Sequence, residues 1–226
     1  SLPRLGAIVE AVDALAVRTL GNMTTCVSLD WQLQDQLLRK KPPTSKFVGT
    51  EADKKVKDVF DRTPLHLAAS GGHTDVVALL LANGGDYKIT CGERKEPALF
   101  AAVNKNRGEV VKLLLSKGAE VHAKDAFAET AIDSAVSKGL PEMVELLAKN
   151  GANVNGSGGT SPLHKAASTG QKEVVQILIA NKANVNITIA FGDTPLDWAN
   201  RNGKKEIAEI LKKHGGKTGE ELEAGN

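Results

Sequence analysis

One seven-residue motif occurs five times along this chain and limits what it can fold into. It reads Thr-Pro-Leu-His-Leu-Ala-Ala over residues 63–69, and four diverged copies follow it. The copies begin at Thr63, Glu96, Thr130, Ser161 and Thr194, so the steps between them are 33, 34, 31 and 33 residues. A period in this range indicates a row of small stacked units rather than one closed globular core.

The clearest unit, residues 58–90, predicts two short helices. Thr63 is a favoured N-cap residue, and Pro64 suits the first helical position because its missing N–H is not needed there. An apolar stripe at helical spacing follows over residues 76–81, and Asn83-Gly84-Gly85 is a stop signal. The stop recurs as Gly118, Gly151 and Gly215, with Lys182 in its place once.

These features together resemble the ankyrin repeat. The resemblance is carried by Thr-Pro-Leu-His at 63–66, Ser-Pro-Leu-His at 161–164, and the Gly-Ala-x-Val segments at 118–121 and 151–154. It implies an all-α repeat solenoid, in which stacked helix-turn-helix units carry β-hairpin fingers. It also implies that His66 and His164 are structural, tying one unit to the next, and that the chain binds protein through finger tips and the inner helix face.

The chain divides into three parts on this interpretation. Residues 58–216 form five ankyrin repeats, and residues 217–226 form a flexible tail. Residues 1–57 form an N-terminal helical cap or degenerate repeat with a long loop, although they could instead be a docking appendage. Lys212 stands where earlier units have Leu or Ile, which predicts a polar cap at the last unit.

Two departures from the period predict local irregularities. The finger at residues 155–159 is two residues short and rich in glycine, so we expect a blunt, flexible notch in the row of fingers. The step of 34 residues places one extra residue near Asn104–Arg107, between two helices. We expect that loop to protrude.

The finger tips are the candidate partner-binding surface. In this alignment the tip pairs are Val59-Phe60, Gly92-Glu93, Ala126-Phe127 and Ala190-Phe191. Three phenylalanines therefore lie three residues before a Thr cap, and an exposed row of aromatics usually marks a partner site. The alternative is that each ring folds back onto its own finger or a neighbour. Together with the ends of the first helices, the candidate residues are Val59, Phe60, Ser70, Asn104, Ala126, Phe127, Lys138, Ser168, Thr169, Ala190, Phe191 and Arg201.

Several other functions lack support in the sequence. The net charge of +2 argues against nucleic acid, and no apolar stretch is long enough to span a bilayer. No metal-ligand spacing, nucleophile motif or cofactor motif is present, since Gly216-Lys217-Thr218 lacks the rest of a phosphate-binding loop. Whether Cys26 and Cys91 pair stays open, although reduced thiols in an intracellular protein are the default.

The sequence therefore predicts a non-enzymatic scaffold or adaptor that binds a protein partner. One alternative is an accessory subunit anchored in a larger complex by residues 1–57. Another is the regulatory ankyrin domain of a longer enzyme.

Overall fold

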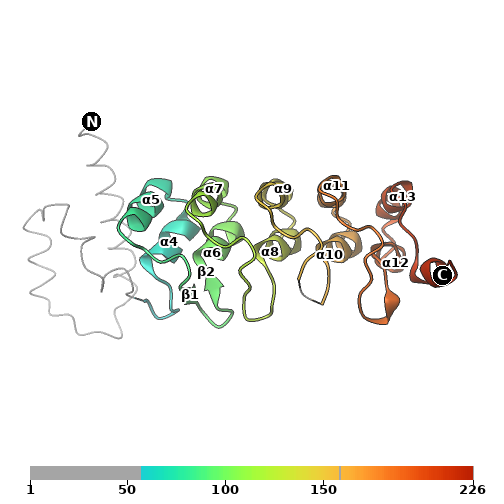
Figure 1. Cartoon of the computed structure of the whole chain (residues 1–226), viewed down its shortest axis with the longest axis horizontal. Helices are drawn as coiled ribbons and strands as arrows, with labels where there is room; N and C mark the ends of the chain where they lie inside the picture. Colours follow the sequence, from blue (N-terminus) through green and yellow to red (C-terminus); the bar gives the residue numbers. More distant parts are fainter. Residues whose placement is uncertain (1–56, 158, 226) are drawn as a thin grey trace, which may run out of the picture.

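The computed structural model describes residues 57–157 and 159–225, which form a single row of helix pairs (Figure 1). Nearly all of the predicted N-terminal cap, residues 1–57, lies outside the described residues. The inner helices are α4 (Pro64–Gly71), α6 (Ala98–Asn104), α8 (Ala131–Ser137), α10 (Pro162–Thr169) and α12 (Pro195–Arg201). The outer helices are α5 (Thr74–Ala82), α7 (Gly108–Ser116), α9 (Pro141–Lys149), α11 (Lys172–Ala180) and α13 (Lys205–Lys213).

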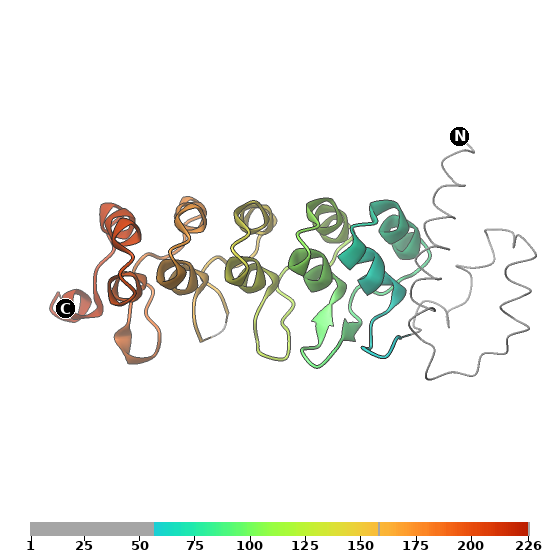
Figure 2. The same ribbon diagram turned by 180° about the vertical axis from the view of Figure 1, so that it is seen from behind.

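The row has three layers, which both views show (Figures 1 and 2). The outer helices form one edge, the inner helices lie in the middle, and loops between the units hang from the opposite edge as fingers. Inner helices pack against inner helices of the next unit, and outer helices do the same. Strands β1 (Thr90–Cys91) and β2 (Glu96–Pro97) lie in the finger before α6, and a 3₁₀ turn, η1 (Ala190–Gly192), lies in the last finger. This confirms the predicted helical solenoid.

The core is a thin slab that runs the length of the row. Each inner helix contributes small or branched apolar side chains, such as Ala68 and Ala69, that are wholly buried. Each outer helix adds residues such as Val111 and Leu114. Burying one Leu side chain contributes about 1.5–3 kcal/mol. Because every slab rests on the next, the array is stabilised mainly by contacts between neighbouring units.

The two histidines of the motif link adjacent units, as the resemblance implied. The backbone N–H of Thr63 donates to Nδ1 of His66 at 3.2 Å, and Nε2 lies 3.2 Å from the carbonyl oxygen of Glu96 in the next unit. A carbonyl can only accept, so Nε2 carries the proton and Nδ1 is the acceptor. In the fourth unit, Nδ1 of His164 lies 2.8 Å from the hydroxyl of Ser161, and Nε2 lies 3.0 Å from the carbonyl oxygen of Asp193 in the next unit. Burial lowers the pKa of both imidazoles, which favours this neutral form.

Aspartates replace the histidine in two units and bond locally. The carboxylate of Asp133 accepts from the backbone N–H and the hydroxyl of Thr130 at 2.9 and 2.6 Å. Asp197 does the same with Thr194 and also accepts from the N–H of Gly219 at 2.8 Å. The shorter carboxylate thus closes the helix N-terminus within its own unit.

The structure corrects the predicted register of the second unit. The N-cap of α6 is Pro97, not Glu96, so the five units begin at 63, 97, 130, 161 and 194. In this register Leu99, Phe100, Ala102 and Val103 fill the buried places that Leu65, His66, Ala68 and Ala69 fill in α4. A shift by one residue would turn the helix by about 100° and expose that face.

The expected protruding loop near Asn104–Arg107 is therefore wrong. The N–H of Arg107 bonds to the carbonyl of Ala102 at 2.9 Å, as His73 bonds to Ala68 in the first unit. Asn106 has a positive φ of 54°, which matches Gly72 at 84° in the equivalent place. The inter-helix turn is thus the same in both units. The extra residue lies in the finger that precedes Pro97.

The chain end forms more structure than the predicted tail. Helix α14 (Gly219–Glu223) follows the last stop, and the side chain of Thr218 accepts from the N–H of Glu221. The carbonyl of Lys217 accepts from the hydroxyl of Thr194 at 2.8 Å, and its N–H donates to Asn186 at 2.8 Å. These bonds place the segment against the final unit. Lys212 is exposed, in keeping with a polar cap.

Candidate partner-binding surface on the fingers

The predicted tip residues lie at the exposed ends of the fingers. Among the described residues, the exposed large apolar side chains are Val59, Phe60, Phe127 and Phe191, with 70%, 62%, 66% and 102% of their surface accessible. Ala126 is exposed beside Phe127, and Ala190 lies in the turn η1 with Phe191. The four large exposed side chains therefore belong to the finger segments, and Figure 1 shows the fingers along one edge of the row.

The first and third tips share one turn, built around an aspartate. Oδ1 of Asp125 accepts from the backbone N–H groups of Phe127 and Glu129 at 2.9 and 3.0 Å. Oδ1 of Asp58 makes the same pair of bonds to Phe60 and Arg62, both at 2.9 Å. An aspartate that bonds to the backbone two residues on stabilises a tight turn. Both turns therefore present their phenylalanine in a fixed backbone frame.

An arginine completes this arrangement in each of the two fingers. In the first, Nε of Arg62 donates to Oδ2 of Asp58 at 2.7 Å, and the guanidinium lies 5.0 Å from the ring centre of Phe60. In the third, the arginine comes from the preceding finger. Nη2 of Arg94 donates to Oδ2 of Asp125 at 2.5 Å, and the guanidinium lies 4.7 Å from the ring centre of Phe127.

Arg94 is the centre of a charged cluster that spans three units. It also contacts Glu96 at 3.2 Å and Glu129 at 2.9 Å, and Glu129 pairs with Lys165 of the next inner helix at 2.5 Å. Although burial opposes it, hydrogen bonding to Asp125 and Glu129 raises the pKa of Arg94. The bond from Lys165 is the main reason that the pKa of Glu129 is lowered. Both groups therefore stay charged at neutral pH.

The backbone connects the same fingers directly. The N–H of Gly92 donates to the carbonyl of Phe60 at 3.0 Å, and the N–H of Ala126 donates to the carbonyl of Arg94 at 2.7 Å. The first three fingers are thus hydrogen-bonded side by side. In the corrected register Arg94 lies three residues before Pro97, so it occupies the phenylalanine position of the second finger.

The fifth finger is built differently. Ile189 stands where Asp58 and Asp125 stand, so this tip has no carboxylate at that position to hold the turn. Phe191 has a φ of 70°, in the left-handed region that costs a non-glycine residue roughly 1–2 kcal/mol. Its ring is fully exposed. Phe191 therefore lacks the aspartate-centred turn of the first and third tips, and its ring does not fold back onto neighbouring residues.

The inner-helix candidates form a polar floor beside the fingers. Ser70 and Ser168 are partly buried, and their hydroxyls donate to carbonyls of their own helices. Lys138 and Thr169 are exposed, and the hydroxyl of Thr169 also donates to its own helix. The hydroxyl bonds leave these serines and Thr169 little capacity to donate to a partner.

Asn104 and Arg201 join the helix face to the finger bases. Asn104 donates to Glu96 at 3.1 Å and accepts from the hydroxyl of Ser134 at 2.7 Å. Arg201 forms a two-bond pair with Asp193 at 2.8 and 2.9 Å. The indole N–H of Trp198 donates to the same carboxylate at 3.3 Å, in keeping with a packing role for this ring. These bonds thus tie the inner helices to the bases of the fingers.

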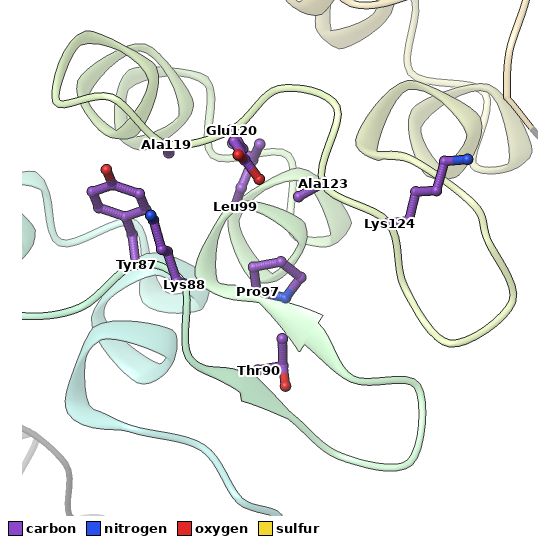
Figure 3. A pocket seen from close by; sticks show the side chains of 9 residues that line it. All are labelled: Tyr87, Lys88, Thr90, Pro97, Leu99, Ala119, Glu120, Ala123 and Lys124. Carbon is purple, nitrogen blue, oxygen red and sulfur yellow. The ribbon is translucent and has the colours of Figure 1, made fainter.

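A shallow hollow of about 230 Å³ lies away from the tips, between the bases of two successive fingers (Figure 3). It is lined by Tyr87, Lys88, Thr90, Pro97, Leu99, Ala119, Glu120, Ala123 and Lys124. Its side chains are mixed in charge and converge on no single point. None of the predicted partner-binding residues lines it.

Sequence reasoning missed the most connected residue of the surface. Arg94 was hidden because the one-residue error in the second unit made Glu93 the tip position. Asp125 and Asp58 lie five residues before Thr130 and Thr63, and that shared spacing could have revealed the turn. The pairing of Arg94 with Asp125 links residues 31 positions apart, which no local pattern shows.

The fold and these bonds define a class of protein, the helical repeat solenoid with hairpin fingers and motif-linked units. A family model described as ankyrin repeats in three copies matches residues 35–125, 85–158 and 132–221. The chain belongs to the ankyrin repeat family.

Three relatives show the same kinship over parts of the chain. Transient receptor potential cation channel subfamily A member 1 of Drosophila melanogaster is 39% identical over 71 residues, 31% of this chain and 6% of that protein. Ankyrin repeat and KH domain-containing protein mask-1 of Caenorhabditis elegans is 37% identical over 75 residues, 32% of this chain and 3% of that protein. Putative ankyrin repeat protein FPV244 of fowlpox virus is 32% identical over 92 residues, 41% of this chain and 13% of that protein. The matched segments therefore span no more than 13% of these three relatives.

Two further features of the described ranges concern membranes and metals. Over these ranges the helices are too short or too polar to cross a bilayer. The same residues hold no group of three or more metal-ligating side chains.

Ankyrin repeats are generally protein–protein interaction modules and are typically non-catalytic.

Proposed function

We propose that this chain is a non-catalytic scaffold or adaptor that binds a protein partner along the finger tips and the adjoining inner-helix face. One observation carries the proposal. The large apolar side chains exposed among the described residues gather on one edge of the solenoid, at Val59, Phe60, Phe127 and Phe191. Frame packing does not require apolar residues there, and exposed aromatic groups of this kind are typical of interface anchors.

The polar residues around the tips support the same surface. Arg201 and Lys138 are exposed on the inner-helix side. Arg94, Glu96 and Glu129 add charges of both signs beside the Phe127 tip. An interface usually combines a few apolar anchors with a polar rim. The shallow hollow of Figure 3 offers no comparable anchor.

Binding can be measured with selected peptides in place of the natural partner. Peptides of about twenty residues would be selected from a displayed random library on the full chain, and the affinities of single clones measured by fluorescence anisotropy. Phe127→Asp should weaken binding by about 30-fold or more, the size of a typical hot spot. The matched control is Lys117→Asp, an exposed position at the end of outer helix α7.

The expected result is a loss with Phe127→Asp and unchanged affinity with Lys117→Asp, while both variants keep their helical circular dichroism. If clones bind Phe127→Asp as tightly as the original chain, the finger tips are not the binding surface. If only Lys117→Asp lost peptide affinity, the binding surface would lie on the outer helices instead.

A further inference from the structure

The three exposed phenylalanines are held in unequal ways, and the difference points to one residue. Phe60 is stacked by an arginine of its own finger, Phe127 by an arginine of the preceding finger, and Phe191 by no described arginine. The side chain of Asp125 is fully buried, whereas that of Asp58 keeps 12% of its surface exposed. Of these two fingers, the third therefore has the more enclosed turn carboxylate.

We propose that Arg94 is a positioning residue that holds Phe127 ready for a partner, and that Phe127 is the main anchor of the surface. This rests on the proposed function. Arg94 acts on Phe127 through three contacts, two from its guanidinium and one from its backbone. Its guanidinium lies over the ring, its Nη2 bonds the carboxylate that fixes the turn, and its carbonyl accepts from Ala126 next to the ring.

The geometry gives this arrangement a consequence for binding. A side chain that is already ordered loses less rotamer freedom when a partner docks, which improves affinity without any added contact. Cation–π stacking against one face of the ring leaves the other face and the edge for the partner. The partner group that fits the free face of the ring is an apolar or aromatic side chain, which packs against an aromatic surface.

Arg94 is itself held in place from both sides. Glu96 of its own finger and Glu129 of the next finger pair with its guanidinium, and Lys165 holds Glu129 in turn. Residues of three units thus fix the position of the guanidinium that stacks on Phe127. The equivalent arginine of the first finger, Arg62, has only the contact with Asp58 of its own turn among its described ion pairs.

The test uses the full chain and the selected peptide clones described above. Arg94→Ala should weaken binding by about 10-fold, and Phe127→Ala by about 30-fold. If Arg94 acts through the ring, the double variant should bind no more weakly than Phe127→Ala alone, because the two effects are coupled. Arg94→Lys keeps a cation but cannot contact Asp125, Glu129 and Glu96 through separate guanidinium nitrogens, so we expect an intermediate loss. Lys117→Ala, at the exposed end of outer helix α7, is the control and should leave the affinity within about twofold.

A second readout reports the ring itself. The ¹³C relaxation of the Phe127 ring should show greater motion in Arg94→Ala without any peptide, while the Phe191 ring is unchanged. This measurement separates positioning from a general loss of fold, which would alter both rings.

The outcomes discriminate between the two proposals. Full affinity in Phe127→Ala would overturn the proposed binding surface. Loss in Phe127→Ala with full affinity in Arg94→Ala would overturn only the role of Arg94. A further tenfold loss from Arg94→Ala in the Phe127→Ala background would show that Arg94 contacts the peptide itself, which also overturns the positioning role.

Discussion

The third and fifth fingers carry a phenylalanine at the same place in the repeat, yet their physical states differ. In the third, a buried carboxylate fixes the turn and an arginine from the preceding finger covers one face of the ring. In the fifth, Ile189 replaces the carboxylate, and the ring is wholly exposed. The left-handed residue is Phe191 itself, whereas in the third finger it is Ala128, the residue after the ring. A repeated residue therefore does not guarantee a repeated environment. The surrounding polar groups decide whether an exposed ring is an ordered anchor.

The largest expected effect comes from breaking the third turn. Asp125→Ala removes the acceptor of two backbone N–H groups and leaves Arg94 without its buried partner. We expect a loss of about 2–3 kcal/mol in the free energy of unfolding, measured by urea denaturation. The exposed part of Arg94 can find water, so the loss should stay below that of a fully buried broken pair.

Asp58→Ala is the matched comparison for that experiment. It removes the same turn bonds from a carboxylate that is more exposed, so its loss should be smaller, about 1 kcal/mol. Equal losses for the two variants would mean that the link between fingers adds nothing to the third turn.

Lowering the pH should weaken the histidine links between units before it affects the contact between Phe127 and Arg94. Folding lowers the pKa of His66 and His164, because burial opposes their charged form. Their contribution to stability is therefore complete above the unfolded pKa of about 6.5, and it declines as the pH falls from there toward the lower folded pKa. The third unit has Asp133 in place of the histidine.

We expect the melting temperature to fall between about pH 7 and pH 5, while the Phe127 ring keeps its contact with Arg94. Melting curves and ring proton shifts would be recorded at each pH. A His66→Asp variant, which copies the third unit, should show a weaker pH dependence over this range. An unchanged melting temperature would contradict a neutral, buried imidazole.

The smallest expected effect concerns the strained tip. Phe191→Gly relieves a left-handed φ, while glycine adds freedom to the unfolded chain. The net expectation is a gain of about 0.5 kcal/mol, whereas Phe127→Gly should destabilise the chain by about 1 kcal/mol, because it removes a stacked ring. Thermal melting of the two variants would show shifts of opposite sign. Shifts of the same sign would remove the distinction between the two fingers.

Much of the frame could be predicted from local pattern. The Thr-Pro pair, the small residues that follow it and the left-handed stops at Gly118, Gly151 and Lys182 all act within a few residues. The second unit was misaligned because Glu96-Pro97-Ala98 imitates the Thr-Pro-Leu start. Burial set the true register, since only one rotation of α6 places Phe100 and Val103 inside.

The sequence by itself determined the repeat, its helices and the exposed phenylalanine positions, because each depends on short spacings and on side-chain type. Only the tertiary structure decided which ring is held, because Arg94 and Asp125 meet across two fingers through stacking of whole units. The strength of that contact depends on burial and on the distance between charged groups. Neither quantity exists until neighbouring repeats pack.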